Sequence, residues 1–290
     1  MKITVLSENT AGPDSRLKAE FGLSLLIETG GATLLFDTGA SDRFALNADA
    51  LGVDLAKVDW LVLSHGHYDH GGGLRAFFER NRHAKAVMKP GVERPHVGTL
   101  VPGLPTLLHK THLLTRDIGL DPQVLSDNAH RIVWAHEPLD LAEGIRVLPS
   151  IPRVHPLPKG NRFLLALEEG RFVPDAFSHE LLLVVDGAPG AVVFSGCAHS
   201  GILNMLEAVA RDAPTRAVHA VVGGFHQTLP KSEKMSGTSA EVRDLALTLG
   251  ERVTGDIYTG HCTGTEAFGV MRGVLGERLR ALHTGMQIDQ

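Results

Sequence analysis

Short apolar runs alternate with amphipathic stretches along the chain, which is the pattern of an α/β layered fold. In the first half, apolar residues 22–29 and 33–36 flank Gly30-Gly31, a glycine pair that suits a two-residue hairpin turn. Residues 60–63 form a third apolar run and predict a buried strand, and residues 74–82 are expected to be helical. The first half therefore predicts strands that lead into a helix.

The second half repeats this alternation more clearly. Apolar residues 181–185 and 191–194 flank a turn that contains Asp186-Gly187 and Pro189-Gly190. The elements expected after this turn are a helix at 202–211, a strand at 217–222, a helix at 239–249, a short strand at 256–259 and a closing helix at 265–282. Ligand sites in α/β sheets lie outside the carboxyl ends of strands, so polar residues that follow these strands are the candidates for function.

No Ser/Gly tract, charge block or low-complexity segment divides the chain, so residues 1–290 are expected to form a single domain. The stretch around 89–138 is rich in proline and weakly periodic. This stretch predicts a lid or an irregular insertion in the domain.

The composition narrows the class of protein. An apolar fraction of 43% and a charged fraction of 21% are typical of a soluble globular protein. The net charge of −5 argues against a general nucleic-acid surface, and no long apolar window predicts a membrane span. The N-terminus reaches Glu8 too early for the core of a signal peptide. With only two cysteines, Cys197 and Cys262, both expected to be reduced, we expect a cytoplasmic protein. Nothing in the sequence indicates an oligomeric state.

The buried run at residues 60–63 leads into a cluster of metal-binding side chains. Three histidines and an aspartate occupy four of the six positions 65–70: His65, His67, Asp69 and His70. In an extended chain His65 and His67 point to the same side, whereas Asp69 and His70 fall where the chain turns into a helix. Imidazole nitrogen and carboxylate oxygen are ligands that zinc and similar divalent metals prefer. A single histidine is usually an ordinary polar residue, but this density predicts a metal site with ligands for two adjacent ions.

These residues also carry a family resemblance. The segment His65-Gly66-His67-Tyr68-Asp69-His70 resembles the His-x-His-x-Asp-His signature of the metallo-β-lactamase superfamily. Residues 33–39 resemble the strand and Asp-Thr-Gly segment that precedes it, and residues 194–201, 223–226 and 259–264 resemble the 7,8-dihydropterin-6-methyl-4-(β-D-ribofuranosyl)aminobenzene-5′-phosphate synthase-like branch. The resemblance covers nearly the whole chain. It implies a four-layered αββα sandwich, the metallo-β-lactamase fold, with the metals in a groove between its two halves.

Two further histidines, His199 and His261, each follow a buried strand that breaks at glycine. A histidine at the start of a helix is the ordinary alternative for His199. We expect His199 to complete the ligand set of one metal in place of a histidine that many relatives carry elsewhere. That metal would be held by His65, His67 and His199, and the other by Asp69, His70 and His261. The expected cofactors are two divalent ions, with zinc first and manganese or iron as alternatives.

The chain departs from the family pattern in two places. Many members have Gly-Asp where this chain has Gly196-Cys197, and that aspartate bridges the metals. Two readings of Cys197 stay open: its thiolate bridges the ions, or its buried thiol supports His199 from behind. Many relatives also place a histidine ligand after the strand near Met88, where this chain has Lys89-Pro90, and His96 is the nearest histidine beyond. All remaining histidines lack ligand spacing and are expected at the surface or in loops, including His83, His109, His112, His130 and His136.

Three residues are expected to act on or around the metals. Asp37 would orient the ligand loop without touching a metal. Asp69 would bind one metal and orient the nucleophile, and His226, which follows Gly223-Gly224, would donate to a developing anion. A surface histidine after a strand is the ordinary alternative for His226.

The leading hypothesis is a dinuclear metal-dependent hydrolase that uses a metal-bound hydroxide to cleave a small, phosphate-bearing ester. The branch resemblance implies an alternative, a pterin-related synthase or transferase that uses the same metals. A planar pterin would favour aromatic walls, and the chain has only two Trp, two Tyr and eleven Phe. A non-catalytic metal sensor is the third hypothesis. Paired ligand sets argue against it, because one closed site is enough for a structural metal.

Overall fold

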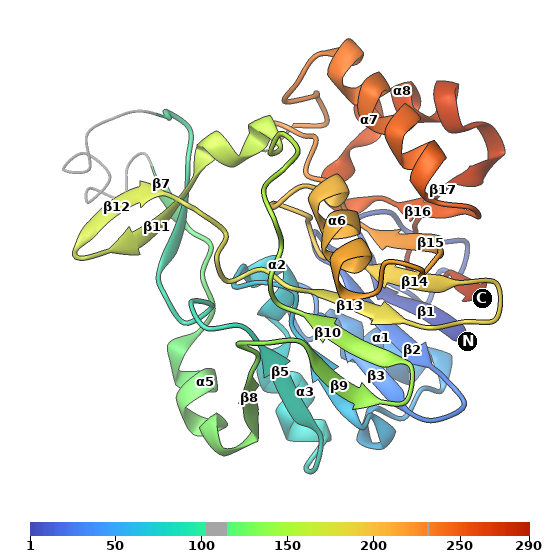
Figure 1. Ribbon diagram of the computed structural model, residues 1–290. Helices are drawn as coiled ribbons and strands as arrows, with labels where there is room; N and C mark the ends of the chain where they lie inside the picture. The colour runs from blue at the N-terminus through green and yellow to red at the C-terminus, as the bar shows by residue number, and fades with distance from the viewer. Residues whose placement is uncertain (103–114, 231) are drawn as a thin grey trace.

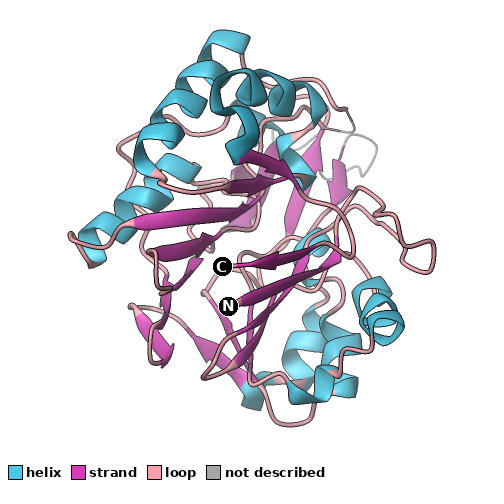
Figure 2. Cartoon of the chain, turned by 90° about the vertical axis from the view of Figure 1, so that its right-hand side faces the viewer, coloured by secondary structure: helices cyan, strands magenta, loops and turns pink. Residues whose placement is uncertain are grey.

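The computed structural model describes residues 1–102, 115–230 and 232–290 (Figure 1). Two seven-stranded sheets pack face to face, and helices cover the outer face of each (Figure 2). This confirms the predicted α/β architecture, a four-layered αββα sandwich. The two ends of the chain lie side by side, because the first and last strands pair with each other in antiparallel register.

The first sheet is built mainly from the first half of the chain. Its strands, in spatial order, are β18 (Gln287–Asp289), β1 (Lys2–Ser7), β2 (Ser24–Glu28), β3 (Thr33–Phe36), β4 (Trp60–Val62), β5 (Lys85–Met88) and β8 (Ile132–Trp134). The predicted hairpin at Gly30-Gly31 is confirmed, since β2 and β3 pair antiparallel and the Thr29 N–H donates to the Ala32 carbonyl. From β3 to β8 the strands run parallel, so their carboxyl ends meet at one edge.

The second sheet comes from the second half. Its strands, in spatial order, are β17 (Leu279–Ala281), β16 (Ile257–Thr259), β15 (Val218–Gly223), β14 (Ala191–Phe194), β13 (Leu182–Val185), β10 (Ile145–Leu148) and β9 (Leu139–Ala142). Here β14, β15, β16 and β17 are parallel. The predicted strands and turn of this half are confirmed to within two residues.

Helices lie outside both sheets, with short 3₁₀ turns between elements. The helices are α1 (Arg43–Leu51), α2 (Tyr68–Gly71), α3 (Leu74–Arg80) and α5 (Pro122–Asp127) on the first half, and α6 (Ile202–Asp212), α7 (Ser239–Arg252) and α8 (Thr265–Leu275) on the second. The 3₁₀ turns are η1 (Leu55–Lys57), η2 (Ala129–Arg131), η3 (Lys159–Phe163), η4 (His261–Thr263) and η5 (Gly276–Arg278).

The prediction of a closing helix at 265–282 was wrong about where the helix ends. It stops at Leu275 because Gly276 adopts a left-handed φ of 57°, which terminates a helix, and the chain then enters β17.

Buried apolar residues form three layers that hold this arrangement together. The central layer lies between the sheets, where the rings of Phe36 and Phe194 are 6.1 Å apart. One outer layer packs the first sheet on its helices through residues such as Phe44 and Phe77, and the other packs α6, α7 and α8 on the second sheet. Each fully buried large side chain stabilises the fold by about 1.5–3 kcal/mol. The ligand-bearing loops therefore extend from a rigid support.

A small four-stranded sheet projects beside the sandwich, at the left of Figure 1. Its strands, in spatial order, are β12 (Arg171–Pro174), β11 (Leu164–Glu168), β6 (His96–Thr99) and β7 (Thr115–Asp117). The stretch predicted as a lid or insertion, around 89–138, contributes β6 and β7 to this sheet and α5 and β8 to the first half, while residues 103–114 lie outside the described residues. A lid function for this stretch stays a prediction.

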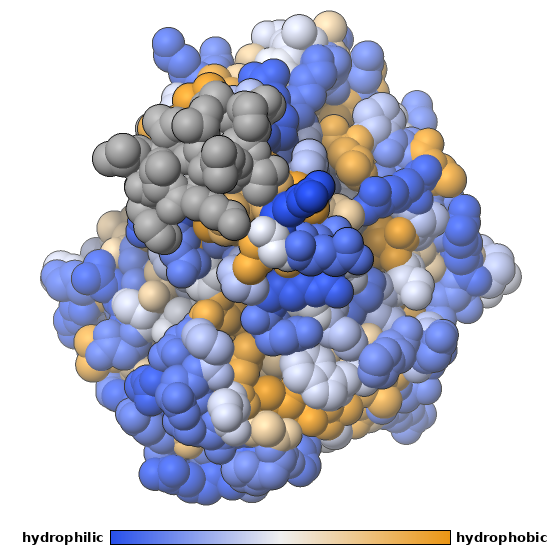
Figure 3. Space-filling model, turned by 90° about the vertical axis from the view of Figure 1, so that its left-hand side faces the viewer, coloured by the Kyte–Doolittle hydropathy of each residue, from blue (hydrophilic) through white to orange (hydrophobic). Residues whose placement is uncertain are grey.

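Figure 3 shows the side of the molecule that faces left in Figure 1. Hydrophilic residues cover most of this face, and apolar residues appear between them in smaller groups. No helix among the described residues is long and apolar enough to cross a membrane.

Candidate metal centre

The polar residues that were predicted to bind metal meet at the carboxyl ends of parallel strands from both sheets. The loop after β4 carries residues 64–70, and the loops after β14, β15 and β16 carry His199, His226 and His261. All of the predicted ligand side chains are at least nine-tenths buried. We call His65, His67 and His199 the first cluster, and Asp69, His70 and His261 the second cluster.

In the second cluster two imidazoles and a carboxylate converge. The Nε2 atoms of His70 and His261 are 3.1 Å apart, and the Asp69 carboxylate lies 3.2 Å from His261 Nε2 and 3.7 Å from His70 Nε2. Burial raises the pKa of Asp69, but the nearby His70 and His261 lower it overall, so its carboxylate is ionised. The group offers three ligand atoms around one point.

The hydrogen bonds on the far side of each ring engage Nδ1 and leave Nε2 for the centre of the cluster. His70 donates through Nδ1 to the Asp37 carboxylate at 2.7 Å, and His261 donates through Nδ1 to Asn9 Oδ1 at 2.9 Å. In neutral rings both Nε2 atoms are then unprotonated and face each other. Burial lowers the pKa of His261, yet Cys262 and Asp69 raise it overall to about 9, which means that the cluster attracts a positive charge. A divalent cation meets this demand, so the residues fit a metal.

The first cluster has the same character. His65 Nε2 and His67 Nδ1 are 3.1 Å apart, and the buried Nε2 of His199 has no hydrogen-bond partner among the described residues. Burial lowers the pKa of all three histidines well below the usual value, and neighbouring histidines add to the effect. The rings are therefore neutral at physiological pH. Their lone pairs are available to a metal, as they must be for ligation.

Hydrogen bonds also fix the orientation of the His65 and His199 rings in the first cluster. Ser64 donates its hydroxyl to the Asp37 carboxylate at 2.7 Å and accepts from His65 Nδ1 at 2.9 Å. His199 donates through Nδ1 to Asn161 Oδ1 at 3.1 Å. In both rings the Nε2 lone pair is left for the centre of the cluster. Outer partners of this kind are typical of metal-binding histidines.

Cys197 lies between the two clusters. Its sulfur is 3.1 Å from His70 Nε2, and it falls within 4.8 Å of ligand atoms in both clusters. Burial raises the pKa of the Cys197 thiol, and the neighbouring Cys262 adds to the effect. A bound metal would be needed to make it a thiolate. The position suits a bridging ligand, but bridging itself stays a prediction, and both cysteines are free thiols in this structure.

Buried carboxylates hold the ligand loops from behind. Asp37 accepts from the Ser64 backbone as well as from His70, and its orienting role stays a prediction. Glu180 accepts the backbone N–H groups of His199 and Ser200 at 2.7 and 2.6 Å, and burial raises its pKa to about 7. Glu8 accepts the backbone N–H of His261. Neither Glu8 nor Glu180 was identified from the sequence, because nothing in their local pattern points to a loop 19 to 253 positions away.

Backbone strain marks the same region. Six non-glycine residues of the described chain adopt a left-handed φ, and four of them belong to the ligand loops or their supports: Asp37, Ala198, His226 and His261. Such conformations cost of order 1–3 kcal/mol each and persist where the surroundings impose them. The concentration of strain here is typical of a functional site.

A cavity of about 470 Å³ opens above the two clusters. Asp69, Cys197, His199 and His261 lie at its floor together with His226, whose ring is 4.2 Å from that of His199, centre to centre. Both ring nitrogens of His226 are buried without a hydrogen-bond partner in the described residues, so they are available to a ligand. Aromatic and cationic residues line the walls, namely Phe21, Tyr68, Phe163 and Arg116.

Comparison with known proteins agrees with this geometry. The sequence-family model of the metallo-β-lactamase superfamily matches residues 17–220 of this chain. The chain belongs to this superfamily. The 7,8-dihydropterin-6-methyl-4-(β-D-ribofuranosyl)-aminobenzene-5′-phosphate synthase of Methanocaldococcus jannaschii is 30% identical over 298 residues, which cover 98% of this chain and 95% of the synthase.

Solved structures of the superfamily share the fold. The crystal structure of Tm1679, a metal-dependent hydrolase of the β-lactamase superfamily, matches with a TM-score of 0.80 and 25% identity, covering 100% of this chain and 99% of that one. Zinc-bound PqqB from Methylobacterium extorquens matches with a TM-score of 0.56 and 14% identity over the whole of both chains, which shows a common fold.

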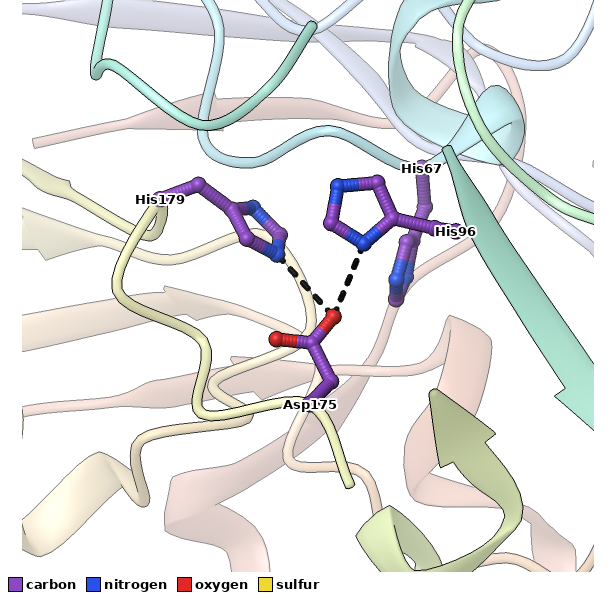
Figure 4. A group of neighbouring side chains, drawn as sticks. All are labelled: His67, His96, Asp175 and His179. Atoms are coloured by element: carbon purple, nitrogen blue, oxygen red, sulfur yellow. Dashed lines mark hydrogen bonds and ion pairs between the residues drawn. The ribbon is translucent and has the colours of Figure 1, made fainter. Parts of the chain in front are cut away.

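One group beside the metallo-β-lactamase signature was not identified from the sequence. His96, at the start of β6, lies with Asp175 and His179 next to His67 (Figure 4). The three histidines are buried, and the Asp175 side chain is only 3% exposed. Asp175 and His179 stand in a loop after β12 with no ligand-like spacing, so the sequence holds no signal for them. The prediction that the remaining histidines are ordinary surface or loop residues was therefore wrong for His179, which is buried beside His67. By contrast His83, His130 and His136 are exposed as expected, and His109 and His112 fall outside the described residues.

Proposed function

We propose that this protein is a dinuclear metal-dependent enzyme that acts on a small, phosphate-bearing ester in the cavity above the two clusters. The observation that carries the proposal is the meeting of two sets of buried metal-binding side chains beside one cavity, with Cys197 between them. The first cluster would hold one ion and the second cluster the other. Zinc is the expected metal, with manganese or iron as alternatives.

When bound, the two ions would supply a nucleophile at neutral pH by acidifying water and would polarise a substrate oxygen. Asp69, ionised and facing the cavity, would orient the nucleophile through its remaining carboxylate lone pairs. His226 would donate to the charge that develops on the opposite oxygen. Arg116, whose guanidinium lies 5.0 Å from the centre of the Tyr68 ring, would attract the phosphate group at the wall.

The test compares chelator-treated protein with protein reconstituted with zinc, manganese or iron on a panel of phosphomonoesters, phosphodiesters, lactones and thioesters. We expect turnover that depends on metal and favours phosphate-bearing substrates. Arg116→Gln should raise KM for those substrates and leave KM for uncharged esters unchanged. Equal activity with and without chelator, or no turnover of any ester, would overturn the proposal.

A second candidate is a pterin-related synthase that uses the same metals. Two observations favour it: the relative from Methanocaldococcus jannaschii carries that name, and the cavity concentrates three of the chain's few aromatic residues, Phe21, Tyr68 and Phe163, on its walls. Such walls suit a flat heterocycle. Incubation with a pterin precursor and an aminobenzene ribofuranosyl phosphate, followed by mass spectrometry, distinguishes the two functions, because only a synthase forms a joined product.

The finer properties follow from the same proposal. The partner is a small molecule, since the wall residues enclose a cavity of limited volume. Two free thiols beside the metal centre support a location in the reducing cytoplasm. The net charge of −5 supports the absence of a nucleic-acid partner.

A further inference from the structure

A second group of buried histidines adjoins the metal centre through His67. Asp175 lies at its centre: Oδ2 is 2.9 Å from His96 Nδ1 and 3.2 Å from His179 Nε2 (Figure 4). Asp175 also accepts the Phe177 backbone N–H at 2.6 Å through Oδ1. We call His96, Asp175 and His179 the Asp175 group. No role in the proposed reaction has yet been given to it.

The proton positions in this group can be worked out from its outer contacts. The Gly66 backbone N–H donates to His179 Nδ1 at 3.0 Å, so this nitrogen is unprotonated and His179 must donate through Nε2 to Asp175. His96 donates through Nδ1 to Asp175 at 2.9 Å, and its Nε2 lies 3.2 Å from the Gly91 carbonyl. Both rings are thus fixed from outside, and they hold the Asp175 carboxylate in one orientation.

The same proton positions disfavour a metal ion inside the Asp175 group. One ligand atom from each of His67, His96, Asp175 and His179 lies within 4.8 Å of the others, which is close enough for a shared ion. However, His179 would have to bind as an imidazolate, because its Nδ1 already accepts from Gly66. His67 would also have to be an imidazolate if its Nδ1 binds the first metal. Two imidazolates at one site would be costly, whereas hydrogen bonding needs none.

The remaining question is what the Asp175 group does for His67. Because Nδ1 of His67 faces His65, Nε2 lies on the opposite side of the ring, and it is buried with no hydrogen-bond partner among the described residues. A buried N–H without an acceptor costs free energy. A ring nitrogen of His67 is within 4.8 Å of the Asp175 carboxylate, the nearest fixed negative charge in that group.

We infer that Asp175 is the positioning residue of His67. Its carboxylate, held by His96 and His179, accepts the Nε2–H of His67 directly or across one water molecule, and so keeps the Nδ1 lone pair directed at the first metal. The inference rests on the proposed metal centre, and it adds three residues from outside the signature to the support of that centre. A carboxylate behind a ligand histidine raises the basicity of the ring and fixes its tautomer.

The first arm of the test needs no metal, and its decisive spectrum is that of the wild-type protein. Long-range ¹H–¹⁵N spectra of the imidazole rings in metal-free protein, with His67 assigned from the spectrum of His67→Gln, report which nitrogen carries the proton. We expect the Nε2–H tautomer in the wild type and a shift toward Nδ1–H in Asp175→Asn. A wild-type His67 protonated at Nδ1 would overturn the inference, and this result stands even if the variant does not fold.

The second arm measures binding of zinc by competition with a chromophoric chelator. Asp175→Asn should weaken one of two equivalents by about 10- to 100-fold. In a His67→Ala background the same change should have no further effect, because the residue through which Asp175 acts is gone. Asp212→Asn is the matched control: it removes another carboxylate that pairs with buried or half-buried cationic side chains, Arg146 and Arg216, and should leave zinc binding unchanged.

Other results of these two measurements show which part of the inference or of the proposed metal centre is wrong. An equal loss in both backgrounds would show that Asp175 acts through the general fold, which would overturn the inference. A third equivalent of zinc in the wild type that disappears in Asp175→Asn would make the Asp175 group a metal site and overturn it as well. The expected tautomer without any zinc binding would support the contact between Asp175 and His67 and overturn the proposed metal centre.

Discussion

The two ligand clusters differ in the part of the molecule that holds their histidines from behind. In the second cluster, His70 is held by Asp37, directly after β3, and His261 by Asn9, shortly after β1. Both supports belong to the first sheet, close to the middle of the sandwich. The second cluster is therefore built into the core of the fold.

The first cluster draws part of its support from outside the sandwich. His199 is held by Asn161 in η3, and His67 faces Asp175, which directly follows β12 of the small sheet. The small sheet also carries Arg116, in β7, to the wall of the cavity. If the proposed function holds, this difference means that one appended element connects substrate recognition with the proposed first metal. Changes in the small sheet should then affect the first cluster and spare the second.

Among these changes, loss of His70 should have the largest effect on stability and metal content. His70→Ala removes a ligand of the second cluster and leaves the buried Asp37 carboxylate without its imidazole donor. Loss of one hydrogen bond to a buried carboxylate costs about 1.5–3 kcal/mol, so both stability and one metal equivalent should fall. Chemical denaturation and elemental analysis measure the two effects. The exposed His83→Ala serves as control and should change neither.

His226 separates catalysis from metal binding. His226→Ala should lower kcat by roughly 10²-fold, as for one donor to a developing anion, because the ring lies at the cavity floor beside His199. Both clusters should keep their metals, which elemental analysis checks. A variant that loses a metal equivalent would make His226 a ligand, and normal turnover would return it to an ordinary histidine.

Replacement of Cys197 should affect metal binding in both clusters alike, because this residue lies between them. If its sulfur binds metal, Cys197→Asp should retain two ions but shift their preference from zinc toward harder ions such as manganese. X-ray absorption of the wild-type zinc protein reports the ligand directly. A spectrum without a sulfur neighbour would leave Cys197 as a supporting thiol and remove the proposed bridge.

The smallest expected effects on metal binding test whether the two clusters have separate supports. Asn9→Ala should weaken only the metal of the second cluster, and Asn161→Ala only that of the first, each by about 10-fold, because each removes the outer partner of one histidine. Competition titrations with zinc distinguish the two equivalents. If either change weakened both metals equally, the clusters would not have separate supports.

Local patterns explain how much the sequence could predict. The strands and the ligand-bearing segment at 65–70 are contiguous, so their period and spacing are visible without a structure, and the αββα sandwich follows from them with the family resemblance. The end of α8 was missed because the left-handed Gly276 stops an otherwise helical pattern. The Asp175 group could not be predicted, because β6 and the loop after β12 bring its members together only through tertiary packing.

The supports of the ligand histidines are also invisible in the sequence. Asp37 was predicted because it belongs to a recognised segment, but Asn9 and Asn161 are 252 and 38 positions from the histidines that they hold. Hydrogen bonds across such separations depend on the packed fold and leave no local pattern. The candidate ligands and Asp37 could therefore be named from the sequence, whereas the other residues that hold the ligand histidines could not.

The measurement that tests the account most directly is the metal content of the purified chain after reconstitution and removal of excess ion. The account predicts close to two zinc ions per chain, and one each in His70→Ala and His67→Ala. No stoichiometric metal would contradict the proposed centre. Three ions per chain would contradict the assignment of the Asp175 group as a support for His67.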